Sequence, residues 1–248
     1  MMSGVNPLRF VLAIDGPASS GKSSVAKGVA QSRGFDYIDT GAMYRAVTWA
    51  VLQQGLELSD SVAIGHCAAD VAPQLRWSSD PLVPAMRVGD VDVTREIREP
   101  EVTAAVSAVS AVPATRAALV LRQRQAVRQA LDEGRGVVVE GRDIGTVVLP
   151  DADLKIWLVA DPTVRAERRV AEDQSAGRVS ASTVEQMAEE LARRDAADAS
   201  RADSPTRQAA DAVAVDATHM TLSEVVASVV ALIDENVTKS NAIPKGQA

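Results

Sequence analysis

The sequence has one cysteine and two histidines, which excludes two common kinds of structural site. Cys67 has no partner for a disulfide within the chain. Together with His66 and His219, it cannot supply the ligand set of a zinc site. We interpret the adjacent His66 and Cys67 as ordinary residues of a helix, because nothing else in the sequence supports a reactive thiol there.

Long apolar runs and an excess of positive charge are missing as well. No apolar run approaches the ~18 residues that a membrane-spanning helix needs, and residues 1–7 lack the charged and apolar regions of a signal peptide. The formal net charge of −7 argues against a general nucleic-acid-binding surface. We therefore expect a cytoplasmic protein that binds neither membranes nor nucleic acids, and its arginines need local explanations.

Aromatic residues are scarce too, at 3% of a 248-residue chain of which 46% is hydrophobic. The core must then be built mostly from Val, Ala and Leu, which suits strands buried on both faces beneath alanine-rich helices. The length allows one medium-sized domain or one domain with inserts.

Residues 16–24 form the most informative motif that the sequence does contain. They read G-x-x-x-x-G-K-S, the Walker A phosphate-binding loop, and are Gly16, Pro17, Ala18, Ser19, Ser20, Gly21, Lys22, Ser23 and Ser24. An apolar run of strand length precedes the loop, and a helix-compatible stretch follows it. The glycines let backbone N–H groups approach phosphate oxygens, Lys22 adds a cation, and the Ser23 hydroxyl can bind Mg²⁺.

Apolar runs that alternate with helical segments predict an α/β fold, with a five-stranded parallel sheet flanked by helices. The expected strands are 10–14, 35–38, 136–139, 154–159 and 212–215. The expected helices are 25–30, 42–54, 101–112, 113–134, one that begins at 162, 183–200 and 222–233. We expect a P-loop core formed by residues 1–58 and 101–238, and a disordered tail at 239–248.

Residues 59–100 have a different character and predict a small insert. The segments 74–77, 85–88 and 91–93 are short and alternate in polarity. Gly89-Asp90 is a two-residue hairpin signal between the last two segments. We expect an antiparallel sheet with one buried face, inserted into the α/β core.

Several arginines lie where a ligand could meet them. Arg45 falls in the first turn of a helix, where a cation opposes the helix dipole; binding of an anion would explain it, and so would an ordinary surface position. Arg142 and Asp143 directly follow a buried strand, at the edge where open parallel sheets bind ligands, although a simple ion pair would also explain them.

Two arginine-bearing helices with a break at Gly177, at about 165–200, suit a lid over phosphates. The first carries arginines at i, i+3 and i+4, and the second places Arg194, Asp198 and Arg201 on one face. A solvated surface would explain the same pattern, so both interpretations remain open.

A P-loop indicates a bound nucleoside triphosphate but leaves the reaction open. A GTPase switch is disfavoured because no Asp has a Gly three residues later and no Asn precedes a Lys. A motor or nucleic-acid machine is disfavoured because the chain is short and acidic and has no basic stripe with aromatics. A kinase is favoured, because phosphoryl transfer mainly requires two anions to be brought together and neutralised, which arginines do well.

Taken together, the motifs resemble those of bacterial cytidylate kinases, in order, from about residue 9 to residue 235. Besides the P-loop they are D-T-G-A-M-Y-R at 39–45, E-I-R at 96–98, P-x-x-R at 113–116, E-G-R-D-I-G-T-V-V at 140–148 and R-D-x-x-D-x-x-R at 194–201. The motifs at 39–45 and 140–148 are far more discriminating than the P-loop alone. The region 59–100 is similar to the enlarged monophosphate-binding insert of the bacterial enzymes.

The resemblance implies the P-loop kinase fold, ATP as the phosphoryl donor and CMP or dCMP as the acceptor. The loop amides and Lys22 would hold the ATP phosphates, Ser23 would bind Mg²⁺, and Arg168 would reach ATP from the lid. The resemblance assigns CMP binding to Thr40, Arg45, Ser107, Arg116, Arg142, Asp143, Arg194, Asp198 and Arg201.

Within that acceptor set, Arg45, Arg142 and Arg201 would hold the phosphate, Ser107, Arg116 and Asp143 would contact cytosine, and Arg194 and Asp198 would contact the sugar. We expect Lys22, Arg142, Asp143 and Arg201 to be catalytic. A carboxylate accepts from the cytosine amino group while an arginine donates to N3, and uracil has the opposite pattern. CMP and dCMP should therefore be preferred over UMP.

Two residues depart from the family pattern. Thr40 stands where Ser is frequent and keeps the hydroxyl, whereas Glu140 stands where Asp is frequent and extends the carboxylate further. No general base is evident beyond Asp143, and an ionised phosphate acceptor needs none. The alternative is another small-molecule P-loop kinase that acts on UMP or on a non-nucleotide acceptor. A monomer is the expected state.

Overall fold

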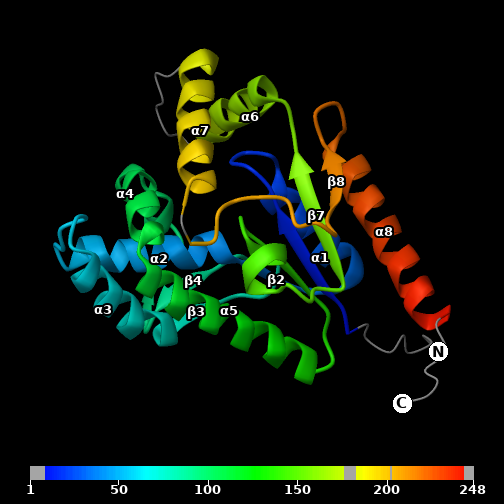
Figure 1. The fold of residues 1–248 in the computed structure, drawn as a ribbon, viewed down its shortest axis with the longest axis horizontal. Coiled ribbons are helices and arrows are strands. Elements are labelled where there is room, and N and C mark those ends of the chain that lie inside the picture. Colours follow the sequence, from blue (N-terminus) through cyan, green and yellow to red (C-terminus); the bar gives the residue numbers. More distant parts are fainter. Residues whose placement is uncertain (1–8, 176–182, 202, 243–248) are drawn as a thin grey trace.

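The computed structural model describes residues 9–175, 183–201 and 203–242. Its centre is the predicted five-stranded sheet, in which every neighbouring pair is parallel (Figure 1). The strand order is β2 (Asp36–Asp39), β6 (Val137–Glu140), β1 (Val11–Asp15), β7 (Leu154–Val159) and β8 (Val213–Asp216). The α/β class and the sheet are thus confirmed, with four of the five strands shifted by one residue.

Strand β1 shows why the sheet lies inside the molecule. All five of its residues are buried, and alternate side chains enter different apolar clusters. Val11 and Ala13 belong to the cluster beneath α2 and α5, whereas Leu12 and Ile14 belong to the cluster beneath α1 and α8. A strand buried on both faces reads as a continuous apolar run, as residues 10–14 do.

Helices α1 (Lys22–Arg33) and α8 (Leu222–Ala242) pack together over one face of the sheet. Helix α8 continues beyond residue 239, where a disordered tail was expected, so that boundary was wrong. Its apolar contacts with the core continue to Val237, and the Lys239–Glu235 pair and the hydrogen bond from Thr238 to the Asp234 carbonyl support the exposed side of the last turns. Residues 243–248 lie outside the described part of the chain.

The other face carries α2 (Thr40–Gln53) and α5 (Pro113–Asp132), with α4 (Pro100–Ala111) leading into α5 through a 96° bend. Pro100 and Pro113 each stand in the first turn of their helix, where a proline leaves no required N–H unpaired. Among the described residues, no single helix is both long and apolar enough to span a bilayer. The bent α4–α5 pair reaches that length and apolar composition only when its two helices are counted as one.

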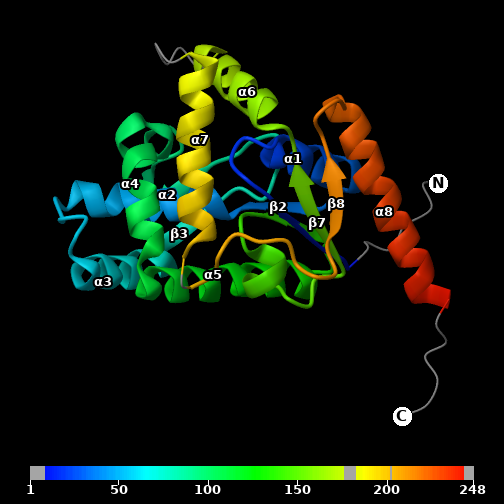
Figure 2. The same ribbon diagram turned by 45° about the horizontal axis from the view of Figure 1, so that its top comes forward.

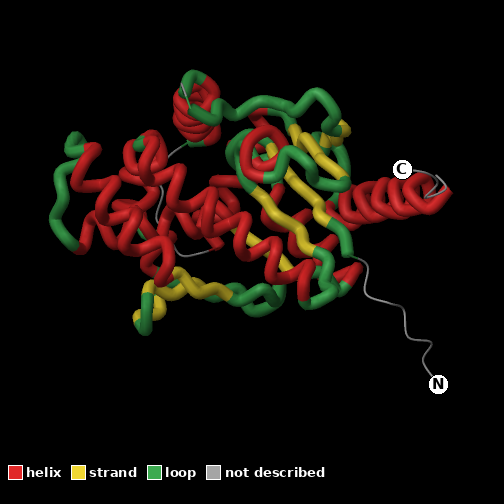
Figure 3. The backbone as a smooth tube through the Cα atoms, turned by 60° about the horizontal axis from the view of Figure 1, so that its bottom comes forward, coloured by secondary structure: helices red, strands yellow, loops and turns green. Residues whose placement is uncertain are grey.

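The segment between α2 and α4 contains the predicted antiparallel sheet, formed by β3 (Leu75–Trp77), β4 (Met86–Val88) and β5 (Val91–Asp92). Gly89 has a φ of +57° in the β4–β5 turn, as the hairpin signal required. Figure 3 shows this small sheet apart from the main sheet. The segment also holds α3 (Ser61–Val71), which the strand pattern did not reveal and which contains His66 and Cys67.

Helices α6 (Pro162–Ser175) and α7 (Val184–Ala199) pack against each other beyond the carboxyl edge of the main sheet (Figures 1 and 2). We call them the lid helices. A capping box formed by Thr183 and Gln186 starts α7. The expected break at Gly177 lies outside the described residues. Helix α7 also contacts α4.

Candidate active site

The P-loop forms the turn between β1 and α1, as predicted. Gly16 has a φ of +154°, and a Cβ there would lie 2.1 Å from the Leu158 carbonyl oxygen, so only glycine fits against β7. Gly21 has a φ of +94° and precedes α1 without a side-chain cap, which leaves the first N–H groups of the helix available to an anion.

Lys22 is almost fully buried within this loop. Its Nζ donates to the Pro17 carbonyl oxygen at 2.6 Å and lies 3.4 Å from Ser20 Oγ. Burial, and then the charge of Arg142, hold the pKa of Lys22 well below its usual value. Because burial and Arg142 disfavour the charged form of Lys22, a bound anion would strongly stabilise its positive charge.

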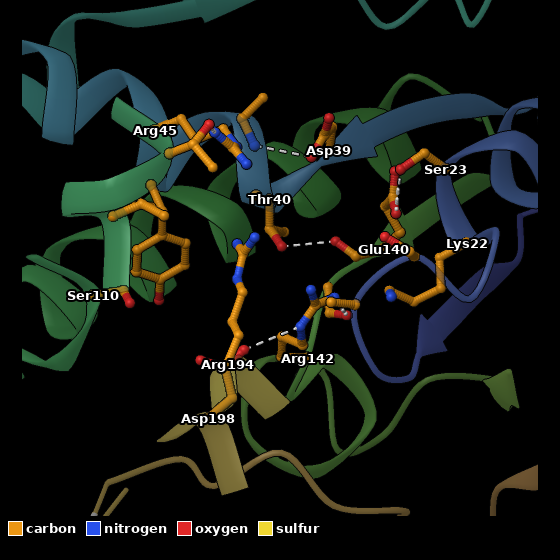
Figure 4. Close-up of a pocket in the computed structure, with 18 of the residues that line it drawn as sticks. Lys22, Ser23, Asp39, Thr40, Arg45, Ser110, Glu140, Arg142, Arg194 and Asp198 are labelled. Atoms are coloured by element: carbon orange, nitrogen blue, oxygen red, sulfur yellow. Dashed lines mark hydrogen bonds and ion pairs between the residues drawn. The ribbon is translucent and has the colours of Figure 1, made fainter. Parts of the chain in front are cut away.

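A cavity of about 530 Å³ opens beside the loop, at the carboxyl edge of the sheet (Figure 4). Eight basic and six acidic side chains line it, a positive excess in a chain whose net charge is −7. The site residues predicted from sequence that line it are Ala18, Ser19, Ser20, Gly21, Lys22, Ser23, Ser24, Thr40, Arg45, Ser107, Arg116, Arg142, Asp143, Arg194, Asp198 and Arg201. Gly16, Pro17 and Arg168 were also predicted and lie outside its wall.

Arg168 instead lies on the other side of the P-loop. Its Nη2 donates to the Ala217 carbonyl oxygen at 2.7 Å, and its Nη1 would be 3.8 Å from a Cβ at Gly21. The lid therefore brings this cation to the loop, separately from the cavity on the acceptor side.

Arg45 projects into the cavity from α2. Its Nη1 donates to Thr103 Oγ1 at 2.8 Å and to the Ile97 carbonyl oxygen at 3.3 Å. Burial, and then the charge of Arg194, lower the pKa of Arg45 to about 10. Both hydrogen bonds of this guanidinium go to neutral oxygens, so an anion in the cavity would stabilise its charge further.

Asp198 on α7 holds two of the other arginines. It pairs with Arg142 Nε at 3.3 Å and with Arg201, which also donates to Ser110 Oγ at 3.0 Å. These contacts join the end of β6, the lid helix α7 and α4 around one side of the cavity.

Arg194 rises from α7 toward Thr40 and Arg142 in Figure 4. Within the described part of the chain its Nε is buried without a hydrogen-bond partner. Burial, and then Arg142, lower the pKa of Arg194. The guanidinium thus stands near other cations at the centre of the cavity, where a bound anion would offset their repulsion.

Arg116 and Asp143 form a buried ion pair at the far end of the cavity, each with about 6% of its side chain exposed. Arg116 also lies over the Tyr44 ring, 5.5 Å from its centroid, and donates to the Ser110 carbonyl oxygen at 3.4 Å. The pair presents donors and acceptors side by side in a dry environment, where unpaired polar groups of a wrong ligand cost most.

Asp15, which the sequence did not single out, supports this pair from beneath. Its carboxylate accepts the N–H groups of Ile144 and Gly145 at 2.8 and 2.7 Å, directly after Asp143. Burial raises the pKa of Asp15 to about 6, although these two hydrogen bonds by themselves lower it. The only sequence signal was a carboxylate that ends an apolar strand before the first P-loop glycine.

Glu140 was expected to extend its carboxylate further than the Asp that is frequent in the family, and the structure shows what holds it. Tyr37 Oη donates to one carboxylate oxygen, and Ser23 Oγ donates to the other at 3.0 Å. Burial, and then Asp39, raise the pKa of Glu140 to about 6. Neither Tyr37 nor Asp39 was among the site residues predicted from sequence.

Mg²⁺ prefers oxygen ligands and usually takes one or two from the protein and the rest from phosphates and water. Ser23 and Glu140 offer such oxygens next to the P-loop. Across the described residues no group of three or more His, Cys, Asp or Glu side chains could hold a metal by itself. The donor set fits an ion held mainly by the nucleotide.

Comparison with known proteins agrees with this geometry. A family model described as cytidylate kinase matches residues 12–235. A cytidylate kinase of Mycobacterium leprae is 49% identical over 91% of this chain and 96% of its own, and one of Streptomyces avermitilis is 46% identical over 91% and 93%. A solved gluconokinase from Sinorhizobium meliloti covers 94% of this chain and 98% of its own at 16% identity, and its TM-score of 0.44 is too low to carry an argument. The chain belongs to the cytidylate kinase family.

Proposed function

We propose that this protein transfers the γ-phosphoryl group of ATP to CMP or dCMP, giving ADP and CDP or dCDP in pyrimidine nucleotide metabolism. The observation that carries the proposal is the single cavity that joins a P-loop at one end to the buried Arg116–Asp143 pair at the other. One end suits a triphosphate and the other suits a base with an amino donor beside a ring acceptor.

At the donor end, the N–H groups of the P-loop and Lys22 bind the β- and γ-phosphates of ATP. Arg168, on the opposite side of the loop, adds charge from the lid. Ser23 and Glu140 would hold Mg²⁺, which supplies charge neutralisation of the phosphates when bound.

At the centre, Arg45, Arg142 and Arg201 bind the phosphate of CMP. Each is already oriented by a partner on another element: Thr103, Asp198 and Ser110 respectively. Guanidinium groups remain charged and bind phosphate oxygens in a bidentate way, so they can hold the acceptor in line with the γ-phosphate and offset charge as it moves. The acceptor phosphate is ionised at neutral pH, so its attack needs no general base.

At the far end, Asp143 accepts from the amino group of cytosine while Arg116 donates to N3, and Ser107 adds a hydroxyl nearby. The sugar is contacted by Asp198 and Arg194, and Thr40 contributes to the phosphate side. In uracil both base positions are reversed, which would leave two buried polar groups unpaired at a cost of about 1–3 kcal/mol each.

The lid helices keep water from ATP until the acceptor is bound, as phosphoryl transfer requires. The division into a P-loop core at 1–58 and 101–238, an insert at 59–100 and a lid at about 165–200 is part of this proposal. A monomer that acts in the cytoplasm, where ATP and CMP are present, is the expected form.

A coupled assay that detects ADP tests the proposal with ATP and, in turn, CMP, dCMP, UMP, AMP and shikimate. We expect turnover with CMP and dCMP at a kcat/KM at least about tenfold above that with UMP, which corresponds to about 1.4 kcal/mol of discrimination. Turnover with UMP or shikimate but with neither cytidine nucleotide would support the alternative acceptors instead.

A further inference from the structure

The backbone of Ala18, inside the P-loop, is bound by the lid at both its N–H and its C=O. The N–H donates to Asp195 Oδ1 at 2.9 Å, and Arg165 Nη1 donates to the C=O at 3.0 Å. Arg165 also pairs with the other oxygen of Asp195 at 2.5 Å. We call this closed set of contacts among Ala18, Arg165 and Asp195 the Ala18 bridge.

Two members of the Ala18 bridge are buried, and the third, Asp195, has 22% of its side chain exposed. Ala18 is 3% exposed and Arg165 is 8% exposed. Ala18 also packs with Ala166, Met187 and Leu191 in an apolar cluster separate from the two that flank the sheet. Hydrogen bonds in such a low-dielectric setting are stronger, and their loss is felt more, than at a wet surface.

The bridge connects the two ends of the active site. On one side, Ala18 lies two residues before Ser20 and four before Lys22, in the loop that receives ATP. On the other side, Asp195 follows Arg194 and precedes Asp198 by one turn of α7, and both of those side chains line the acceptor cavity. Because a helical turn moves as a unit, any shift of α7 that reorients Arg194 and Asp198 also pulls on the Ala18 backbone.

We propose that Arg165 and Asp195 are positioning residues that couple the binding of ATP to the binding of the acceptor. The inference rests on the proposed function, since it takes the P-loop as the donor site and α7 as part of the acceptor site. A ligand that orders the loop favours the bridged position of α7, and a ligand that orders α7 favours the bridged loop. Linkage makes this effect reciprocal, so each nucleotide should tighten the other by the same factor.

Isothermal titration calorimetry with CMP and the β,γ-imido analogue of ATP tests this coupling in the full-length protein. Each ligand is titrated alone and in the presence of a saturating amount of the other. In the wild type we expect each to lower the Kd of the other by at least about fivefold, the lower end of usual coupling factors. In Asp195→Ala and Arg165→Ala the factor should fall to about one.

Two further variants sharpen the test. Asp195→Asn retains an acceptor for the Ala18 N–H but loses the charge that pairs with Arg165, so its factor should be intermediate. It also serves if Asp195→Ala does not fold. The control is Arg193→Ala on the same helix, because Arg193 is 72% exposed and meets only Glu189, at 3.9 Å, among its described ion pairs. It should keep the wild-type factor.

A structural contribution alone would weaken both individual Kd values and leave the coupling factor unchanged, and that result would overturn the inference. So would a wild-type factor of one in a protein that phosphorylates CMP. Failure of the wild type to bind or phosphorylate CMP would count against the proposed function, and is distinct from either result.

Discussion

At the scale of single residues, the proposed function assigns the choice of base to the buried Arg116–Asp143 pair. An ion pair that is removed from water keeps its geometry because each partner would be costly to leave unpaired. Its members come from α5 and from the end of β6, elements that the core packs firmly. In the proposed function, specificity for the base depends on these two charges, which the fold already orients.

We predict that Asp143→Asn narrows the preference for CMP over UMP. The amide loses the charge that pairs with Arg116 and can donate as well as accept, so it no longer penalises the O4 of uracil. The kcat/KM for CMP should fall by about 10- to 100-fold, with a smaller fall for UMP.

The comparison requires both substrates in one assay, with Asp151→Asn as a control on an exposed turn after the same segment. Asp151→Asn should leave the ratio unchanged. An unaltered CMP-to-UMP ratio in Asp143→Asn would remove Asp143 from base recognition.

Sequence analysis could nominate Asp143 but not Asp15 or Asp195. The motifs that name Asp143 lie next to it in the chain. Asp15 acts on N–H groups 129 and 130 residues away, and Asp195 acts on one 177 residues away. No local pattern reports such a contact, because it depends on how the sheet and lid are assembled.

At the scale of elements, helix α1 is fitted closely to α8. A Cβ at Gly28 would lie 2.7 Å from Val226 Cγ2 and 3.6 Å from Cγ1. Valine is stiff about χ1, so its methyl groups cannot simply turn away. The glycine therefore sets the separation of the two helices that cover one face of the sheet.

We predict that Gly28→Ala lowers the free energy of unfolding despite the better helix propensity of alanine. Propensity favours alanine by about 1 kcal/mol, whereas overpacking costs about 1–3 kcal/mol. The net loss should be up to about 2 kcal/mol in urea denaturation.

Val226→Ala in the same chain should relieve the clash, so that the effect of Gly28→Ala reverses in that background. Gln31→Ala, at an exposed position of α1, is the control and should be near neutral. A stabilised single variant would show that the helices can move apart at little cost.

Most elements were predictable because their signals are local. Pro100 and Pro113 marked helix starts, and Gly89 marked the hairpin. His66 and Cys67 were expected to lie in a helix, but the sequence analysis gave α3 no bounds because short strands dominate the rest of its segment, although Asp60 caps it. The end of α8 was missed because only one apolar contact, that of Val237, and an exposed i,i+4 pair follow Ile233 in the described part of the helix.

At the scale of the whole molecule, the buried carboxyl groups make stability depend on pH. The pKa of Asp15 rises to about 6 in the folded protein, mainly through burial, against about 3.9 in an unfolded chain. The folded state thus binds more protons between these values. This group stabilises the fold below about pH 4, and the contribution is lost as the pH rises through about 6.

We predict that Asp15→Asn becomes more stable relative to the wild type as the pH is raised from 4 to 7. The difference in the free energy of unfolding should move in favour of the variant by about 2–3 kcal/mol, on top of a pH-independent loss from the altered hydrogen bonds. Urea denaturation of both proteins at several pH values measures it.

Asp92→Asn provides a control of opposite sign. Hydrogen bonds from Thr94 lower the pKa of Asp92, so its contribution is present above about pH 4 and is lost on acidification. The free energy of unfolding of Asp92→Asn should fall relative to that of the wild type as the pH rises. A pH-independent difference for Asp15→Asn would mean that burial does not raise the pKa of Asp15.

The unpaired Nε atoms of Arg116 and Arg194 also affect the molecule as a whole. Neither atom meets a hydrogen-bond partner among the residues that the structure describes, and both are buried. Such donors cost about 1–3 kcal/mol each until an acceptor reaches them. A bound substrate would supply the missing acceptors. Variants selected only for heat resistance in the absence of nucleotides should therefore tend to replace these arginines, and they should lose activity as a result.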